Sequence, residues 1–206
     1  MSNYLQQYGI VKKTNKSSNV FEKLFPNIFD IEYKKPSEYV NYCWDIYGGY
    51  KGGNNNLNGM IFEYILATLL IREKLLPFYL QAKVVFVPNV HYDLLLYTEE
   101  FGPVAISAKT SLRERYKQAD LEAIALKYVH RRAQCYLVTL NKKEGEGVKQ
   151  KIKKGDVIGL DQVILAETGD IDNLMCSLKK YAFIKAPKVN VVQSDLIVTA
   201  NKVVGR

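Results

Sequence analysis

The pattern of apolar and polar residues predicts helices in the first part of this chain and a mixture of strands and helices beyond it. Between residues 20 and 44, aromatic and aliphatic side chains recur at helical spacing around Pro26 and Pro36, which predicts two short helices. Residues 60–76 carry apolar side chains in a broad stripe. A stripe of this width is typical of a well-buried helix.

Beyond Pro77 the pattern takes the two-residue period and the β-branched runs of strands. Three strands are expected, at residues 83–87, 92–97 and 104–109. A turn at 98–103 joins the last two, a helix is predicted over 112–130, and a buried strand over 134–140. This order of elements indicates an α/β protein.

The ends of the chain and one glycine-rich stretch are expected to lie outside this core. Residues 1–20 mix lysines with small polar residues without a period, which predicts a flexible basic arm or a loosely docked edge. Glycines and asparagines over 48–59 predict a plain connecting loop, with a ligand-clasping role for Tyr50 and Lys51 as the alternative. The C-terminal third is expected to contain strands at 157–160 and 163–165, a helix near 171–181, and one or two strands within 189–204.

Length and composition favour one globular domain over residues 1–206, and the family resemblance described below places its core at about 60–140. The chain has 206 residues, of which 48% are hydrophobic and 24% charged, so disordered and fibrous proteins are excluded. The formal net charge of +8 favours a polyanionic partner.

Cysteine usage and the start of the chain bear on the cellular compartment. The three cysteines lie far apart and form no CxxC pair, which indicates packing thiols in a reducing compartment and neither a disulfide framework nor a zinc site. The first residues are polar and lack the apolar run of a signal peptide, and no apolar stretch is long enough to span a membrane. We expect a soluble cytoplasmic protein.

Candidate chemistry gathers around the second and third predicted strands. Lys109 ends the apolar run Val-Ala-Ile-Ser-Ala, a costly place for a charge that has no partner, and Asp93 and Glu122 are natural partners. Adjacent antiparallel strands bring Asp93 and Lys109 to the same end of the sheet if the register allows it. Arg115 and Glu122 share a helix face, which also fits a plain surface ion pair.

An Asp in one strand and Ser-Ala-Lys at the end of the next resembles the PD-(D/E)XK nucleases. The resemblance implies a restriction-endonuclease-like core, in which a mixed β-sheet is flanked by helices. The chain departs from the simple pattern, because Ser107 stands where a second metal-binding carboxylate is expected and Val90-His91-Tyr92 replaces the Pro before Asp93. The departure resembles type II restriction endonucleases of the EcoRII kind, which cut sites built on CC and GG and take this carboxylate from the following helix.

The string Lys-Thr-Ser-Leu-Arg-Glu-Arg-Tyr-Lys-Gln, which starts at Lys109, resembles that branch. Glu122 stands where the relocated carboxylate is expected, and Glu63 resembles the glutamate of the preceding helix. The resemblance implies that Asp93 and Glu122 bind Mg²⁺ and that Lys109 orients or helps to deprotonate the attacking water. Glu63 would hold a second metal ion, a water on the metal, or Lys109.

The same string offers groups that recognise DNA bases. Arg113 and Arg115 present donors that match guanine, and Glu114 is an acceptor for the amino group of cytosine. Ser111 and Lys117 flank them and complete the set of expected DNA contacts. The alternative is a group of solvated charges at a helix N-terminus, although two arginines there oppose the helix dipole.

The resemblance thus implies a Mg²⁺-dependent type II restriction endonuclease that hydrolyses double-stranded DNA at a short site containing CC and GG. A homodimer would match a palindromic site, and a cognate DNA methyltransferase would be its genetic partner. Two other readings stay open. One is a nuclease of the same fold that acts in repair or on DNA structure, and the other is a non-catalytic, basic DNA-binding module.

Overall fold

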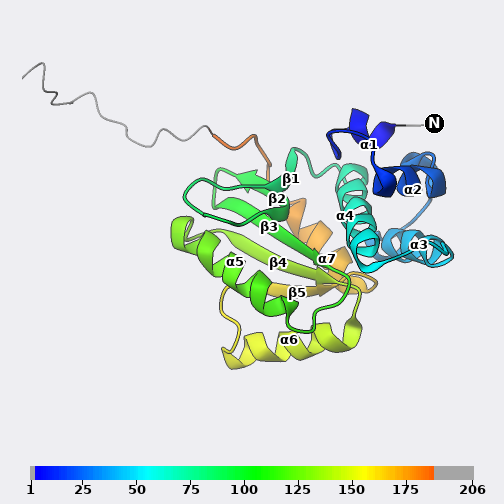
Figure 1. Ribbon diagram of the computed structural model, residues 1–206. Helices are drawn as coiled ribbons and strands as arrows, with labels where there is room; N and C mark the ends of the chain where they lie inside the picture. The colour runs from blue at the N-terminus through cyan, green and yellow to red at the C-terminus, as the bar shows by residue number, and fades with distance from the viewer. Residues whose placement is uncertain (1–2, 188–206) are drawn as a thin grey trace, which may run out of the picture.

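A five-stranded mixed sheet forms the centre of the structure, a computed structural model that describes residues 3–187 (Figure 1). Its strands, in spatial order, are β1 (Phe78–Ala82), β2 (Tyr92–Thr98), β3 (Gly102–Lys109), β4 (Gln134–Thr139) and β5 (Gln162–Leu165). The pairs β1–β2 and β2–β3 are antiparallel, whereas β3–β4 and β4–β5 are parallel. The expected α/β fold, a mixed sheet flanked by helices, is confirmed.

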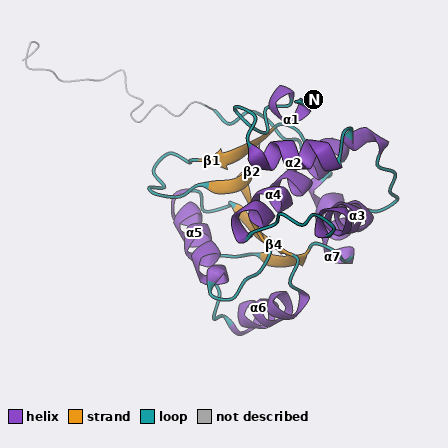
Figure 2. Ribbon diagram, turned by 45° about the vertical axis from the view of Figure 1, so that its right-hand side comes forward, coloured by secondary structure: helices purple, strands orange, loops and turns teal. Residues whose placement is uncertain are grey.

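Helices cover both faces of the sheet (Figures 1 and 2). One face carries α4 (Asn55–Arg72) and α7 (Gly169–Leu178), and the other carries α5 (Arg115–Val129) and α6 (Lys142–Lys154). The remaining helices pack outside α4, and they are α1 (Tyr4–Gln7), α2 (Lys16–Leu24), the 3₁₀ helix Ile28–Asp30 and α3 (Pro36–Gly48). None of the helices within residues 3–187 combines the length and apolar character needed to cross a membrane.

Side chains of the central strands alternate between two apolar layers, as the two-residue period of a strand requires. Leu94 and Leu96 of β2 point into the layer beneath α4, whereas Leu95 joins the layer beneath α5. Helix α4 is buried on most of its surface, with Ile61 and Ile65 fully inaccessible. The broad apolar stripe predicted for this helix therefore corresponds to a central element of the core.

The strand predicted at residues 83–87 is wrong. The edge strand is Phe78–Ala82, and the following residues form a loop in which Val85 and Phe86 are exposed. Phe86 has a φ of 67°, which a regular strand does not allow. The β-branched run reads as a strand in isolation, but β2 already pairs with Phe78–Ala82 through the register that sets Phe78 opposite Leu96.

The expectation of a flexible arm over residues 1–20 is also wrong for its described part. Tyr4, Leu5 and Ile10 are buried, and α1 is fastened to α2. The hydroxyl of Tyr4 donates to the carbonyl of Phe25 over 2.7 Å, and Glu22 Oε1 accepts from the Leu5 N–H over 2.8 Å. The N-terminal segment is thus part of the helical layer around α4.

Several boundaries in the rest of the chain differ from the prediction. The loop expected over 48–59 is shorter, because Asn54 caps α4 by accepting from the Leu57 N–H and the helix begins at Asn55. No strand forms at 157–160, and residues 142–154, for which no element was predicted, form α6. The helix near 171–181 is Gly169–Leu178, and the strands predicted within 189–204 lie outside the described residues.

The expectation that all three cysteines pack in the interior holds for two of them. Cys43 and Cys135 are buried as expected, whereas Cys176 is exposed. Burial raises the pKa of both buried thiols to about 12, which keeps them protonated and unreactive.

Candidate active site

Asp93 and Lys109 form a buried ion pair where β2 begins and β3 ends. The antiparallel register that sets Leu94 opposite Ile106 brings these two strand ends together. Lys109 Nζ lies 2.8 Å from Asp93 Oδ2, and the N–H of Ala108 donates to the same oxygen over 2.8 Å. Each of the two charged residues is 8% exposed. The contact expected from the sequence is confirmed, and it neutralises two charges that would be costly alone.

Glu122 reaches this pair from α5. It lines a small cavity together with Ser107 of β3, and Gln118 Nε2 donates to its Oε1 over 2.7 Å. The pKa of Glu122 is raised, mainly by burial. The charge of the nearby Lys109 acts to lower this pKa, and that of Asp93 acts to raise it. Glu122 is thus an electrostatic neighbour of the ion pair without forming an ion pair of its own among the described residues.

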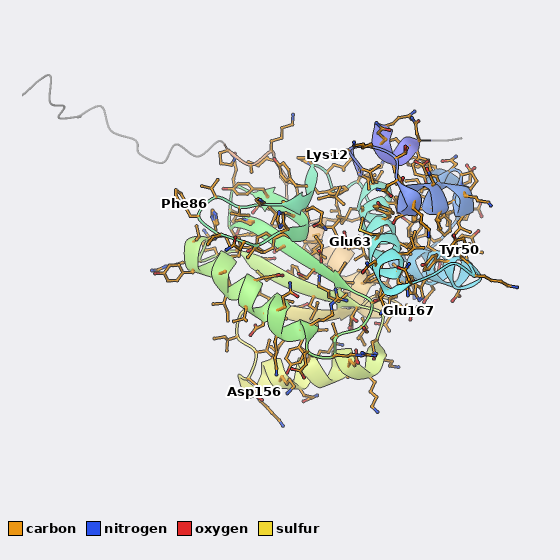
Figure 3. The ribbon with its side chains drawn as sticks, viewed as in Figure 1. Lys12, Tyr50, Glu63, Phe86, Asp156 and Glu167 are labelled. Atoms are coloured by element: carbon orange, nitrogen blue, oxygen red, sulfur yellow. The ribbon has the colours of Figure 1, made fainter. Side chains whose placement is uncertain are left out.

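Glu63 approaches from the other face of the sheet, on α4 (Figure 3). Its Oε2 accepts from Gln81 Nε2 over 2.9 Å. Burial, followed by the charge of Asp93, raises the pKa of Glu63 to about 7, while Gln81, Lys109 and Arg115 act in the opposite direction. A carboxyl group with this pKa changes its protonation near neutral pH.

The site contains one residue that the sequence analysis missed. Gln81 belongs to β1, the strand that was predicted at the wrong position, and it has a φ of 47°. Its amide holds the carboxylate of Glu63 at the edge of the sheet. The hydrogen bond joins residues from two different elements, and a sequence pattern gives no sign of it.

The residues predicted to contact DNA lie in the segment between β3 and α5 and in the first turn of α5. Arg113, Glu114 and Lys117 are exposed, and the last two form an ion pair with each other. Arg115 is the first residue of α5 and is exposed, while Ser111 is half-buried. Arg115 and Glu122 form no ion pair within residues 3–187, so the plain surface pair is absent from this part of the chain.

The carboxylates near Lys109 are of the kind that binds divalent cations. Within residues 3–187 no three His, Cys, Asp or Glu side chains form a ready metal cluster. Mg²⁺ usually takes one or two carboxylates and completes its shell with waters and phosphate oxygens. Asp93 Oδ1 and Glu122 Oε2 accept no hydrogen bond from the described residues, so each carboxylate keeps one hard oxygen for this purpose. By residue type, Asp93 and Glu122 suit Mg²⁺.

Comparison with known proteins identifies the fold. No protein-family model matches the sequence, and no curated protein matches it. A solved structure described as a complex of the restriction endonuclease PspGI with substrate DNA is similar, with a TM-score of 0.55 and 14% identity over 82% of this chain and 83% of that chain. The fold is that of a restriction endonuclease. In this restriction-endonuclease fold, the Asp93–Lys109 pair lies at the junction of the antiparallel and parallel halves of the sheet. The EcoRII-like branch and the CC/GG site stay predictions.

Proposed function

We propose that the protein is a Mg²⁺-dependent type II restriction endonuclease that cuts double-stranded DNA at a short site containing CC and GG. The observation that carries the proposal is the buried pair of Asp93 and Lys109 in a restriction-endonuclease fold, with Glu63 and Glu122 around it. Two charges with 10% of their side chains exposed are a costly feature for stability alone. Beside this pair the pKa values of Glu63 and Glu122 are raised, and carboxylates with shifted pKa values are concentrated at functional sites.

The proposed reaction is hydrolysis of a phosphodiester bond. A water oxygen attacks phosphorus, the bond from phosphorus to the sugar oxygen breaks, and the water protons end on the leaving oxygen and in solvent. Asp93 and Glu122 would hold Mg²⁺, which polarises the phosphoryl group when it is bound. Lys109, fixed by Asp93, orients the water and offsets the negative charge that develops on the phosphate. Glu63 belongs to the same electrostatic cluster, and Gln81 orients its carboxylate.

Recognition of the site is assigned to Ser111, Arg113, Glu114, Arg115 and Lys117. Arginines pair with guanine through two hydrogen bonds, and a glutamate accepts from the cytosine amino group. The ion pair between Glu114 and Lys117 is exposed to solvent, where such pairs contribute little to stability. Its two partners are therefore available to DNA at little cost.

A homodimer and a protecting methyltransferase complete the proposal. A palindromic site has two-fold symmetry, which a C₂ dimer matches with one active site for each strand. The net charge of +8 favours association with DNA in general.

The test is incubation of the purified protein with unmethylated phage DNA, in Mg²⁺ or in EDTA. Lys109→Ala and Glu122→Ala should abolish cleavage, whereas Glu146→Ala, which removes an exposed carboxylate of α6, should cut like the wild type. Discrete fragments that need Mg²⁺ support the proposal, and sequencing their ends gives the site. A smear would identify a nonspecific or structure-selective nuclease, and a protein that shifts DNA without cutting it would be a binding module.

A further inference from the structure

The segment between β3 and α5 is fastened to α6 by one short hydrogen bond. The backbone N–H of Leu112 donates to Glu144 Oε2 over 2.6 Å, and the side chain of Leu112 is fully buried in the layer beneath α5. The residues between Lys109 and Arg115 belong to no helix or strand. Their position therefore depends on contacts such as this one, and a hydrogen bond to a carboxylate is among the stronger kinds.

Glu144 owes its own position to the end of β4. In the parallel pair β3–β4, Thr139 lies opposite Lys109, so the two chains leave the sheet side by side. Thr139 Oγ1 accepts from the Asn141 N–H over 3.2 Å, and Asn141 caps α6 by accepting from the Glu144 N–H over 3.0 Å. The carboxylate that holds Leu112 is thus built on the strand next to Lys109.

The backbone conformation next to Leu112 indicates why this segment needs to be fixed in place. The next residue, Arg113, has a φ of 39°, a left-handed conformation that costs free energy for a residue with a Cβ. Such a conformation persists where its neighbours are fixed. C-terminal to Arg113, Tyr116 makes a second contact with α6, because Lys151 Nζ lies 5.7 Å from the centroid of its ring.

We propose that Glu144 is a positioning residue for sequence recognition, which acts by holding Leu112 and with it the exposed side chains of Arg113 and Glu114. The inference rests on the proposed function, since recognition presupposes a DNA site. It assigns to α6 a role in specificity, although α6 supplies no residue to the active site described above.

The experiment compares Glu144→Ala, Glu144→Gln and Glu146→Ala. The glutamine keeps an acceptor oxygen for the Leu112 N–H, and Glu146 lies on the same helix but pairs with Lys149. Cleavage is measured on a duplex carrying the site found by sequencing, and on duplexes with one base pair changed. In Glu144→Ala we expect the ratio of kcat/KM between the two kinds of duplex to fall by about tenfold, within the range that one base pair contributes. The two other variants should keep the wild-type ratio.

Hydrogen exchange gives a second readout that does not depend on cleavage. The amides of residues 110–115 should exchange at least about tenfold faster in Glu144→Ala than in Glu144→Gln, because the segment opens locally when its anchor is lost. If the wild type cuts DNA and Glu144→Ala discriminates between duplexes as the wild type does, this inference alone is wrong. If the wild type cuts no DNA, the proposed function fails, and the recognition role of Glu144 fails with it.

Discussion

Lys109 Nζ and Asp93 Oδ2 are 2.8 Å apart in a place where only 10% of each side chain is exposed. Neither charge is well hydrated, so each is stabilised by the opposite charge of the other. The carboxylate of Asp93 is also stabilised by a hydrogen bond from the Ala108 N–H. Substitutions of Asp93 and Lys109 can therefore show how much each charge contributes to stability, apart from its role in the proposed reaction.

Removing one partner should cost more stability than removing both. Asp93→Ala leaves an unpaired buried ammonium and should lower the free energy of unfolding by about 3–5 kcal/mol. The double variant Asp93→Leu/Lys109→Met places apolar groups of similar size there and should regain most of this loss. Urea denaturation measures both values, and a double variant as unstable as the single one would contradict the prediction.

The free energy of unfolding should depend on pH through the titration of Glu63. Its pKa is raised from 4.5 to about 7 in the folded protein, so between these values the native state holds a proton that the unfolded chain releases. The free energy of unfolding should therefore fall as the pH rises through this window and become level above it. The four groups that act on Glu63 are Asp93, Gln81, Lys109 and Arg115.

Glu63→Gln supplies the comparison for this pH effect. The glutamine keeps an acceptor for Gln81 and has no proton to release, so its stability should fall less than that of the wild type over the same window. The difference should be about 1–2 kcal/mol, below the full value of the shift because solvent screens part of it. Denaturation curves at several pH values measure it, and parallel profiles for the two proteins would count against the raised pKa.

Glu122 and Ser107 line the same small cavity, which allows a carboxylate to be moved from one element to the other. Glu122→Ala should reduce DNA cleavage by at least about 100-fold, because a carboxylate that would hold Mg²⁺ is lost, and loss of even an outer-shell partner of a metal ligand typically costs about 10–100-fold. Adding Ser107→Glu should restore part of the activity, because the new carboxylate enters the same space from β3. Cleavage rates of the three proteins check this, and a double variant as inactive as the single one would argue against a shared metal-binding position.

Two glycines of α6 should respond in opposite ways to alanine. A Cβ at Gly145 would lie 2.5 Å from Leu165 Cδ2 and 3.1 Å from Thr139 Cγ2, both in the buried contact with the sheet. Gly145→Ala should therefore destabilise the protein by about 1 kcal/mol or more. Nothing lies within 4 Å of a Cβ at Gly147, so Gly147→Ala should stabilise the helix by about 1 kcal/mol. Thermal unfolding distinguishes the two, and equal shifts would be inconsistent with the close approach at Gly145.

The elements that could be predicted from the sequence are those set by local pattern. The hairpin of β2 and β3 follows from the two-residue period and a short turn, and it brings Asp93 to Lys109. Helix α5 follows from its composition, and its spacing puts Glu122 within electrostatic reach of Lys109. In these cases one short stretch of sequence contains the information.

The elements that were missed depend on partners far away in the sequence. The run at 83–87 has stronger β-branched character than Phe78–Ala82, but pairing with β2 selects the latter and brings Gln81 to Glu63. Two glycines disfavour a helix at 142–154, yet Gly145 allows the approach to Leu165 that secures α6. The contact of Glu144 with Leu112 follows from the same packing and is invisible in the pattern.

A single residue, Thr110, separates Lys109 from Ser111, the first residue of the proposed recognition segment. The segment therefore starts on the strand that carries the active site, without a linker at which the chain could be divided. Under the proposed function, a new target sequence could not be obtained by exchanging a DNA-reading domain, as one does with modular DNA-binding proteins. It would have to be selected residue by residue within 111–117, with each change judged by its effect on the rate of cutting as well as on the choice of site.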